Sequence, residues 1–149
     1  MGVCKKLIVL VGLPGSGKSK WAAEQDAGVL SSDAVRELLT GDAEDQSANR
    51  LVFPTLRNLL ATRVKAGMEV TILDATSLTP KERRSWVRTA ESLGCEAEAV
   101  FFDTPLELCK SRNAARSRVV PEDVMDRFAA RLVPPSEAEG FTRVTVIRP

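Results

Sequence analysis

An aliphatic run leads directly into a glycine-rich loop in the segment Leu7-Ile8-Val9-Leu10-Val11-Gly12-Leu13-Pro14-Gly15-Ser16-Gly17-Lys18-Ser19. A continuous run of this kind is typical of a strand buried on both faces in a parallel sheet. The loop matches GxxxxGKS and opens a stretch with a helical pattern, which is the context that this motif requires. Its glycines let backbone N–H groups curl around phosphates, and the helix N-terminus favours anionic charge. The segment therefore predicts a phosphate-binding loop (P-loop).

This loop predicts binding of a nucleoside triphosphate, ATP or another NTP, together with Mg²⁺. Lys18 should contact the β and γ phosphates and is also a catalytic candidate, while the Ser19 hydroxyl should ligate Mg²⁺. The flanking strand and helix disfavour the alternative of a glycine turn without a ligand. The expected nucleotide-binding residues of the loop are Gly12, Leu13, Pro14, Gly15, Ser16, Gly17, Lys18, Ser19 and Lys20.

Strand and helix patterns alternate along the rest of the chain. Further strands are expected at Val29–Leu30, Val70–Leu73, Ala99–Phe102 and Val144–Ile147. Helices are expected at Lys18–Glu24, Asp33–Leu39, Ala48–Ala66, Lys81–Leu93, Leu106–Ala115 and Glu122–Leu132. Such alternation predicts an α/β fold with a mostly parallel sheet, whose ligands lie at the carboxyl ends of the strands.

Helix ends carry their own signals. Thr79-Pro80 with Glu82, and Thr104-Pro105 with Glu107, are expected to form capping boxes at two helix starts. Gly67 and Gly94 are expected to mark the matching helix ends.

Composition limits the class of protein. A chain of 149 residues with 44% hydrophobic and 28% charged residues predicts one compact domain spanning residues 1–149, and it disfavours disordered, collagenous and membrane proteins. The net charge of +1 excludes a globally basic surface for nucleic acid but leaves room for a local patch. The chain contains no histidine, so histidine cannot act as base, phosphocarrier or zinc ligand.

Cysteines and the N-terminal residues indicate a cytoplasmic location. Cys4, Cys95 and Cys109 are odd in number and far apart, so we expect buried, reduced thiols and no disulfide framework. Lys5 and Lys6 precede an apolar run that stops after five residues, which is too short for a secretory signal.

Two polar clusters follow expected strands at the ligand edge. Asp33 and Arg36 share a helical face, so Asp33 could accept a proton from an attacking hydroxyl while Arg36 clamps an acceptor phosphate. The alternative for Asp33 is an ordinary N-terminal charge or cap. Asp74 ends a strand and precedes Thr76, which puts acceptor or magnesium contacts within reach; its alternative is a turn-forming aspartate.

Basic residues gather in two places. The stretch Lys110–Arg118 sits between two helices, as a lid over a triphosphate would, and its arginines could stabilise the transferring phosphoryl group. Its alternative is a solvated face. A second cluster, on a helix expected to be exposed, either guides a polyanion or keeps the helix soluble: Lys81, Arg83, Arg84 and Arg88. Trp86 is expected to pack inside the protein rather than to stack on a base.

Four segments in order resemble the kinase domain of phage and bacterial 5′-polynucleotide kinases. They are GLPGSGKSKW, SSDAVRELL, LDATSLTPKERRSW and SRNAARSRVVPEDV, and the similarity spans nearly the whole chain. The resemblance implies a three-layer, adenylate-kinase-like P-loop NTPase fold with an arginine-bearing lid. Lys20 departs from the threonine of many relatives, and no phosphatase motif is present, so a free-standing kinase module is expected.

The resemblance also implies roles for individual residues. Asp33 corresponds to the general base for the 5′ hydroxyl and Arg36 to the acceptor phosphate clamp, with Asp74 and Thr76 on the acceptor side. Arg116 matches the lid arginine that touches the donor phosphates, with Arg112 as a second candidate. The magnesium shell consists of Ser19 with Asp33 or Asp74 acting through water.

The expected function is therefore transfer of a γ-phosphate to the 5′ hydroxyl of DNA or RNA. Kinases of small metabolites, nucleosides or sugar nucleotides belong to the same wider class, which includes toxin kinases, and the P-loop does not distinguish among them. A regulatory module that binds nucleotide without transfer is the remaining alternative. The expected partners are the triphosphate and a nucleic acid end, with no membrane.

Overall fold

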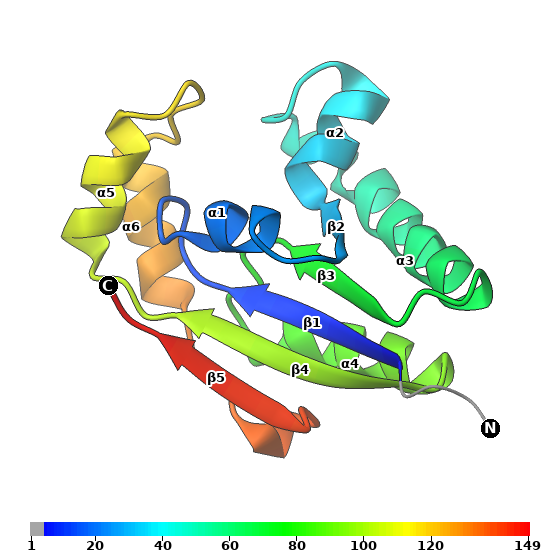
Figure 1. Ribbon diagram of the computed structural model, residues 1–149. Coiled ribbons are helices and arrows are strands. Elements are labelled where there is room, and N and C mark those ends of the chain that lie inside the picture. The colour runs from blue at the N-terminus through cyan, green and yellow to red at the C-terminus, as the bar shows by residue number, and fades with distance from the viewer. Residues whose placement is uncertain (1–4) are drawn as a thin grey trace.

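The sheet at the centre of the molecule consists of parallel strands, as expected. The computed structural model describes residues 5–149, so the expectation for Cys4 falls outside the described residues. Strands β1 (Lys5–Val11), β2 (Gly28–Ser31), β3 (Val70–Asp74), β4 (Cys95–Phe102) and β5 (Arg143–Ile147) are ordered β2-β3-β1-β4-β5. Each of the four strand pairings within the described residues is parallel (Figure 1).

Strand β1 occupies the middle of the sheet because both of its faces are apolar. Leu7, Val9 and Val11 pack into a core with helices on one face, while Leu10 faces a second core on the other side. Helices therefore cover both faces of the sheet, which confirms the expected three-layer α/β fold. The edge strands are less buried than β1, since Val29 of β2 is 39% exposed and Val146 of β5 is 42% exposed.

The helices agree with the sequence patterns to within a few residues. Helices α3 and α4 pack with the core that holds Val9, and α1 packs with the core that holds Leu10. Near the end of β1, α5 and α6 share a third core with Leu13. Their bounds are α1 Lys18–Ala23, α2 Ser32–Thr40, α3 Asn49–Lys65, α4 Pro80–Ser92, α5 Leu106–Ala114 and α6 Glu122–Arg131, with short 3-10 helices η1 Gln46–Ala48 and η2 Glu137–Glu139.

This topology determines where a ligand can bind. The chain crosses from β1 towards β3 and β2 on one side, and β4 and β5 lie on the other side. The loop after β1 therefore lies where the strand order reverses, at the carboxyl edge of the sheet. Within residues 5–149, none of the helices is both long and apolar enough to cross a lipid bilayer.

The two expected capping boxes turn out differently. Thr79 caps α4 as predicted, because its hydroxyl accepts a hydrogen bond from the N–H of Glu82, although the Glu82 carboxylate accepts from the Leu78 N–H rather than from Thr79. The prediction of a capping box at Thr104 is wrong. Pro105 is the N-cap of α5, and the Thr104 hydroxyl donates a hydrogen bond to the Ser16 carbonyl at 3.0 Å. That hydroxyl connects α5 to the glycine-rich loop.

Other local predictions are confirmed. Gly67 and Gly94 follow α3 and α4 with φ of 92° and 74°, the left-handed conformation that glycine adopts at helix ends. Cys95 and Cys109 are buried. Trp86 is 3% exposed and packs in the core, as expected.

The expectation of an exposed basic face on α4 is wrong for Arg83. Lys81, Arg84 and Arg88 are exposed, but Arg83 is fully buried and forms two hydrogen bonds with the Glu139 carboxylate, at 2.7 and 3.1 Å. Arg83 lies on the same helical face as the buried part of α4, so its charge requires the carboxylate that η2 provides.

The basic stretch Lys110–Arg118 lies only partly between helices. Helix α5 continues to Ala114, so the first half of the basic stretch is helical. The lid consists of the loop between α5 and α6. Asn113 closes this loop, because its side-chain amide donates to the Val120 carbonyl at 2.7 Å and accepts from the Val120 N–H at 3.0 Å.

Candidate active site

A cavity of about 1310 Å³ opens at the carboxyl edge of the sheet, bounded by the glycine-rich loop, α2, α3, α4 and the α5–α6 segment. Figure 1 shows the two flanks of this edge, with α2 and α3 on one side and α5 and α6 on the other. Most of the expected site residues line it, namely Pro14, Gly15, Gly17, Lys18, Ser19, Lys20, Asp33, Arg36, Asp74, Thr76, Arg112 and Arg116. Gly12, Leu13 and Ser16 of the loop do not.

The glycine-rich loop has the conformation that its glycines allow. Gly15 and Gly17 have φ of 81° and 107°, a region that side chains rarely adopt. A Cβ atom on Gly15 would also overlap the Cys109 carbonyl of α5. The loop thus packs closely against α5, and Gly17 caps the start of α1.

Lys18 points back into this loop. Its ammonium group donates to the carbonyls of Gly12 and Leu13, both at 2.9 Å, so these two residues hold the lysine although they do not line the cavity. Burial lowers the pKa of Lys18 from 10.5 to about 8; the Asp74 carboxylate opposes this shift and the Arg116 guanidinium adds to it. Lys18 is therefore a cation that an anionic ligand would stabilise further.

Ser19 and Asp74 meet next to Lys18. The Ser19 hydroxyl donates to Oδ2 of Asp74 at 2.8 Å. These are oxygen ligands of the kind that Mg²⁺ prefers, and Mg²⁺ is usually held by one or two protein oxygens together with substrate phosphates and water. Within residues 5–149, no group of three or more His, Cys, Asp or Glu side chains could hold a metal without such help. The donor set therefore fits magnesium that arrives with a triphosphate.

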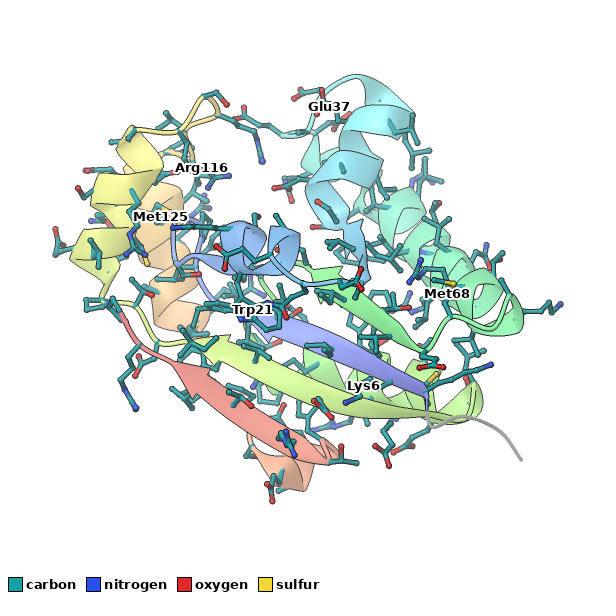
Figure 2. All side chains as sticks on the ribbon, in the orientation of Figure 1. Lys6, Trp21, Glu37, Met68, Arg116 and Met125 are labelled. Carbon is teal, nitrogen blue, oxygen red and sulfur yellow. The ribbon has the colours of Figure 1, made fainter. Side chains whose placement is uncertain are left out.

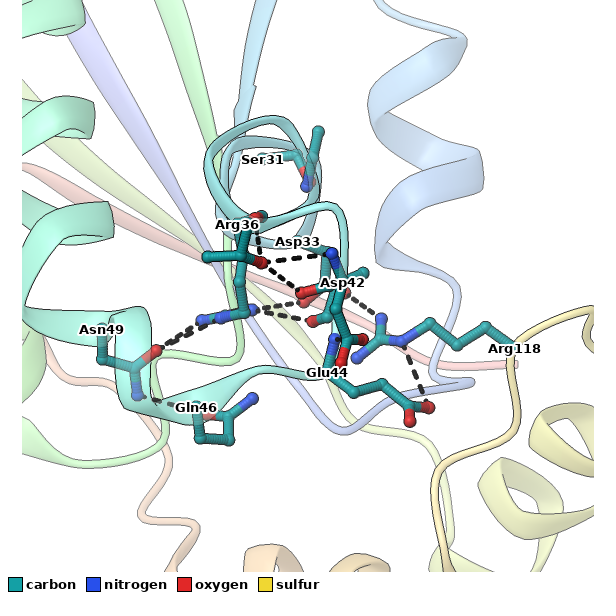
Figure 3. A network of polar contacts seen from close by, with 11 residues as sticks. Ser31, Asp33, Arg36, Asp42, Glu44, Gln46, Asn49 and Arg118 are labelled. Atoms are coloured by element: carbon teal, nitrogen blue, oxygen red, sulfur yellow. Dashed lines mark hydrogen bonds and ion pairs between the residues drawn. The ribbon is translucent and has the colours of Figure 1, made fainter.

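Asp33 is surrounded by arginines instead (Figure 3). Its Oδ1 accepts from Arg36 at 2.9 Å, and its Oδ2 accepts from Arg118 of the lid at 2.7 Å. Arg36 also donates to Oδ1 of Asn49 at 2.8 and 3.3 Å, and to the Ala43 carbonyl. Of the two carboxylates expected near the metal, Asp74 is the one in contact with Ser19.

Arg118 and Asn49 are members of this network that the sequence did not single out. Arg118 also approaches Glu44, with 3.6 Å between Nε and Oε1. The bond between Arg118 and Asp33 joins the two flanks of the cavity, and these two residues are 85 positions apart in the chain. The basic character of Lys110–Arg118 was visible in the sequence, but no local pattern indicated which arginine contacts Asp33.

The loop after β3 forms the floor of the site. The Thr76 carbonyl accepts a hydrogen bond from the Gly12 N–H at 3.2 Å, which ties this loop to the glycine-rich loop. Ser77 has φ of 49°, and its carbonyl accepts from Arg83 at 2.8 Å. The buried Arg83–Glu139 pair therefore supports the backbone of the loop that carries Asp74 and Thr76.

The lid arginines occupy different places. Arg116 follows α5 and points into the cavity (Figure 2). Arg112 lines the cavity and also a smaller hollow of about 240 Å³, on the far side of the glycine-rich loop, whose other lining includes Ser16, Trp21 and Ile147. Lys20 lines both. A flat ring bound in the hollow could contact the Arg112 guanidinium.

A family model described as an AAA domain, AAA_33, matches residues 7–135. The chain belongs to this family of P-loop domains. It is also 24% identical over 147 residues to the bifunctional polynucleotide phosphatase/kinase of Schizosaccharomyces pombe, a match that covers 94% of this chain and 33% of that protein. The resemblance to polynucleotide kinases drawn from the motifs is thereby confirmed.

Solved structures of other proteins share the fold. A chain of the Pnkp1/Rnl/Hen1 RNA repair complex superposes with a TM-score of 0.75 at 21% identity, covering 89% of this chain and 45% of that chain. The APS kinase of Mycobacterium tuberculosis, solved with AMPPNP and APS, gives a TM-score of 0.60 at 19% identity, covering 98% and 89%. The chain thus spans a third of the curated relative and less than half of the RNA repair chain.

Proposed function

We propose that this P-loop kinase transfers the γ-phosphate of ATP, or of another nucleoside triphosphate, to the 5′ hydroxyl of a DNA or RNA end. The observation that supports this most is the position of Asp33, which lines the same cavity as Lys18, Ser19 and Asp74. A carboxylate that can accept a proton thus faces a site suited to a triphosphate. The likeness to a polynucleotide phosphatase/kinase supports the choice of acceptor.

On the donor side, the glycine-rich loop surrounds the phosphates and Lys18 turns from the Gly12 and Leu13 carbonyls towards them. Ser19 and Asp74 would hold a magnesium ion that arrives with the triphosphate, and the ion would neutralise charge on the phosphates. Arg112 and Arg116 line the cavity and offset the negative charge that develops on the transferring phosphoryl group. Positioning and electrostatics thus supply most of the catalysis.

On the acceptor side, the 5′ hydroxyl replaces Arg118 at Oδ2 of Asp33, while Arg36 keeps its bond to Oδ1. The hydroxyl oxygen bonds to the γ-phosphorus as the bond to the β–γ bridging oxygen breaks, and the nucleoside diphosphate leaves. The hydroxyl proton passes to Asp33. Arg36 and Asn49 keep the carboxylate oriented during this transfer.

The Asp33→Asn variant tests this role directly. The amide keeps the shape of the side chain but cannot accept the proton, so transfer to a 5′-hydroxyl oligonucleotide should fall by about 10²- to 10⁴-fold. Calorimetry should show an unchanged affinity for ATP with Mg²⁺. Asp26→Asn, which changes an exposed aspartate outside the cavity, is the matched control. Equal transfer rates in Asp33→Asn and the parent would remove Asp33 from the mechanism.

A further inference from the structure

Arg36 has little capacity left to bind a phosphate. All three of its guanidinium nitrogens already donate hydrogen bonds, to Asp33, Asn49 and the Ala43 carbonyl. Its side chain is only 5% exposed. Arg36 is thus built into the fold as the residue that positions Asp33, and an anion on the acceptor has to be bound elsewhere.

Arg57 of α3 lines the cavity without a carboxylate partner among the described residues, as do Arg112 and Arg116 on the lid side. Its guanidinium lies 5.2 Å from the centroid of the Trp86 ring, and its Nη2 donates to the Ser85 hydroxyl at 2.6 Å. The side chain is half-buried, and it forms no ion pair with any carboxylate of residues 5–149. A partly desolvated cation held by a neutral hydroxyl and an aromatic face is well suited to an incoming anion.

Two other arginines on the same wall differ in this respect. Arg131 pairs with Glu82 at 2.8 Å, and Arg127 approaches Asp123 at 4.0 Å. Their positive charges are already balanced by carboxylates. Arg57 therefore stands out among the arginines at this end of the cavity.

Apolar side chains line the same cavity as Arg57. Phe53 lies one turn before Arg57 on α3 and lines this cavity. Leu78, which precedes α4, and Phe128 of α6 line it as well. Flat apolar side chains beside an arginine without a carboxylate partner in the described part of the chain fit a ligand that combines a ring with an anionic group.

We propose that the chamber formed by Phe53, Arg57, Trp86, Leu78 and Phe128 binds the first base and the first backbone phosphate of the acceptor. Arg57 contacts the phosphate on the 3′ side of the terminal nucleoside, and the base lies against the apolar walls. This assignment rests on the proposed function, because Asp33 must then face the 5′ hydroxyl of the same nucleoside. Arg57 is thus a residue that determines acceptor specificity.

Direct binding tests the chamber without any need for transfer. With the donor site saturated by ADP and Mg²⁺, adenosine 3′-phosphate should bind at least tenfold more tightly than adenosine, as measured by calorimetry. Arg57→Gln should abolish that difference, and Arg57→Lys should restore part of it. The proposal is overturned if the parent does not distinguish the two compounds, or if Arg57→Gln binds adenosine 3′-phosphate as tightly as the parent.

Kinetics separate this inference from the proposed function. With a 5′-hydroxyl oligonucleotide, Arg57→Gln should raise the KM for the acceptor by about 10- to 100-fold, with kcat and the KM for ATP unchanged. Arg50→Gln removes the same charge from an exposed position of α3 outside the cavity, and should leave all three values unchanged. Oligonucleotide transfer with an equal acceptor KM in Arg57→Gln and the parent overturns the role of Arg57 alone. Arg57-dependent binding of adenosine 3′-phosphate without any transfer overturns the proposed function alone.

Discussion

At the scale of single residues, the ionisation of Lys18 limits how strongly the P-loop attracts phosphates. Its pKa is about 8 in the protein without ligand, chiefly because the side chain is buried. A triphosphate favours the charged lysine and raises this pKa, so nucleotide binding takes up a proton at a pH above about 8. Nucleotide affinity should therefore be constant below that pH and fall as the pH rises through it.

The expected loss of affinity is about tenfold between pH 7 and pH 9. Calorimetric titration with a non-hydrolysable ATP analogue and Mg²⁺ measures it. Lys18→Met should bind weakly at both pH values and without this difference. An affinity for the parent that stays constant from pH 7 to pH 9 would contradict the proposed contact between Lys18 and the phosphates.

Single residues also show where local sequence patterns mislead. The tetrapeptides beginning at Thr79 and Thr104 share the pattern Thr-Pro-x-Glu, yet only Thr79 caps its helix. Thr104 instead donates to the Ser16 carbonyl, a partner 88 residues away that no local pattern reveals. The same limit hid Arg118, whereas Asp33 and Arg36 were paired correctly because they are three residues apart on one helix.

At the scale of secondary-structure elements, the buried pair Arg83–Glu139 connects α4 to η2. The exposed fractions of the two side chains are 0% and 9%. Arg83→Met leaves the Glu139 carboxylate buried without its partner, so the free energy of unfolding should fall by about 3–5 kcal/mol. Urea denaturation measures this change.

Two variants control for this result. Arg84→Met changes the exposed neighbour on α4, and should alter the free energy of unfolding by less than about 0.5 kcal/mol. Adding Glu139→Gln to Arg83→Met removes the stranded charge and should recover part of the lost stability. A similar loss in Arg83→Met and Arg84→Met would show that the buried pair does not stabilise the fold.

The burial of Arg83 in α4 follows from a pattern that is visible in the sequence. Arg83 is followed at helical spacing by Trp86, Val87 and Ala90, all of them buried, so its own burial could have been inferred from its face of α4. Its carboxylate partner could not, because Glu139 is 56 residues away. Strand and helix positions were predicted well because hydrophobic periodicity is local.

At the scale of the whole molecule, the parallel topology assembles the site from distant segments. The glycine-rich loop follows β1, Asp74 ends β3 and Asp33 comes directly after β2. The carboxyl ends of these three strands share one edge. The sequence predicted this edge because parallel α/β sheets bind ligands there. It did not predict that the guanidinium of Arg36 is already hydrogen-bonded or that Arg57 has no carboxylate partner within residues 5–149. The first depends on contacts of α2 with Ala43 and with Asn49 of α3, and the second on contacts between α3 and α4.

Transfer of labelled γ-phosphate tests the central claim most directly. The protein is given labelled ATP, Mg²⁺ and, in parallel, DNA and RNA oligonucleotides with a 5′ hydroxyl, the same oligonucleotides with a 5′ phosphate, and a panel of sugars, nucleosides and sugar nucleotides. We expect label on the 5′-hydroxyl oligonucleotides and none on the 5′-phosphorylated ones. Label that appears only on a small molecule, or ATP hydrolysis without transfer, would contradict the proposed function.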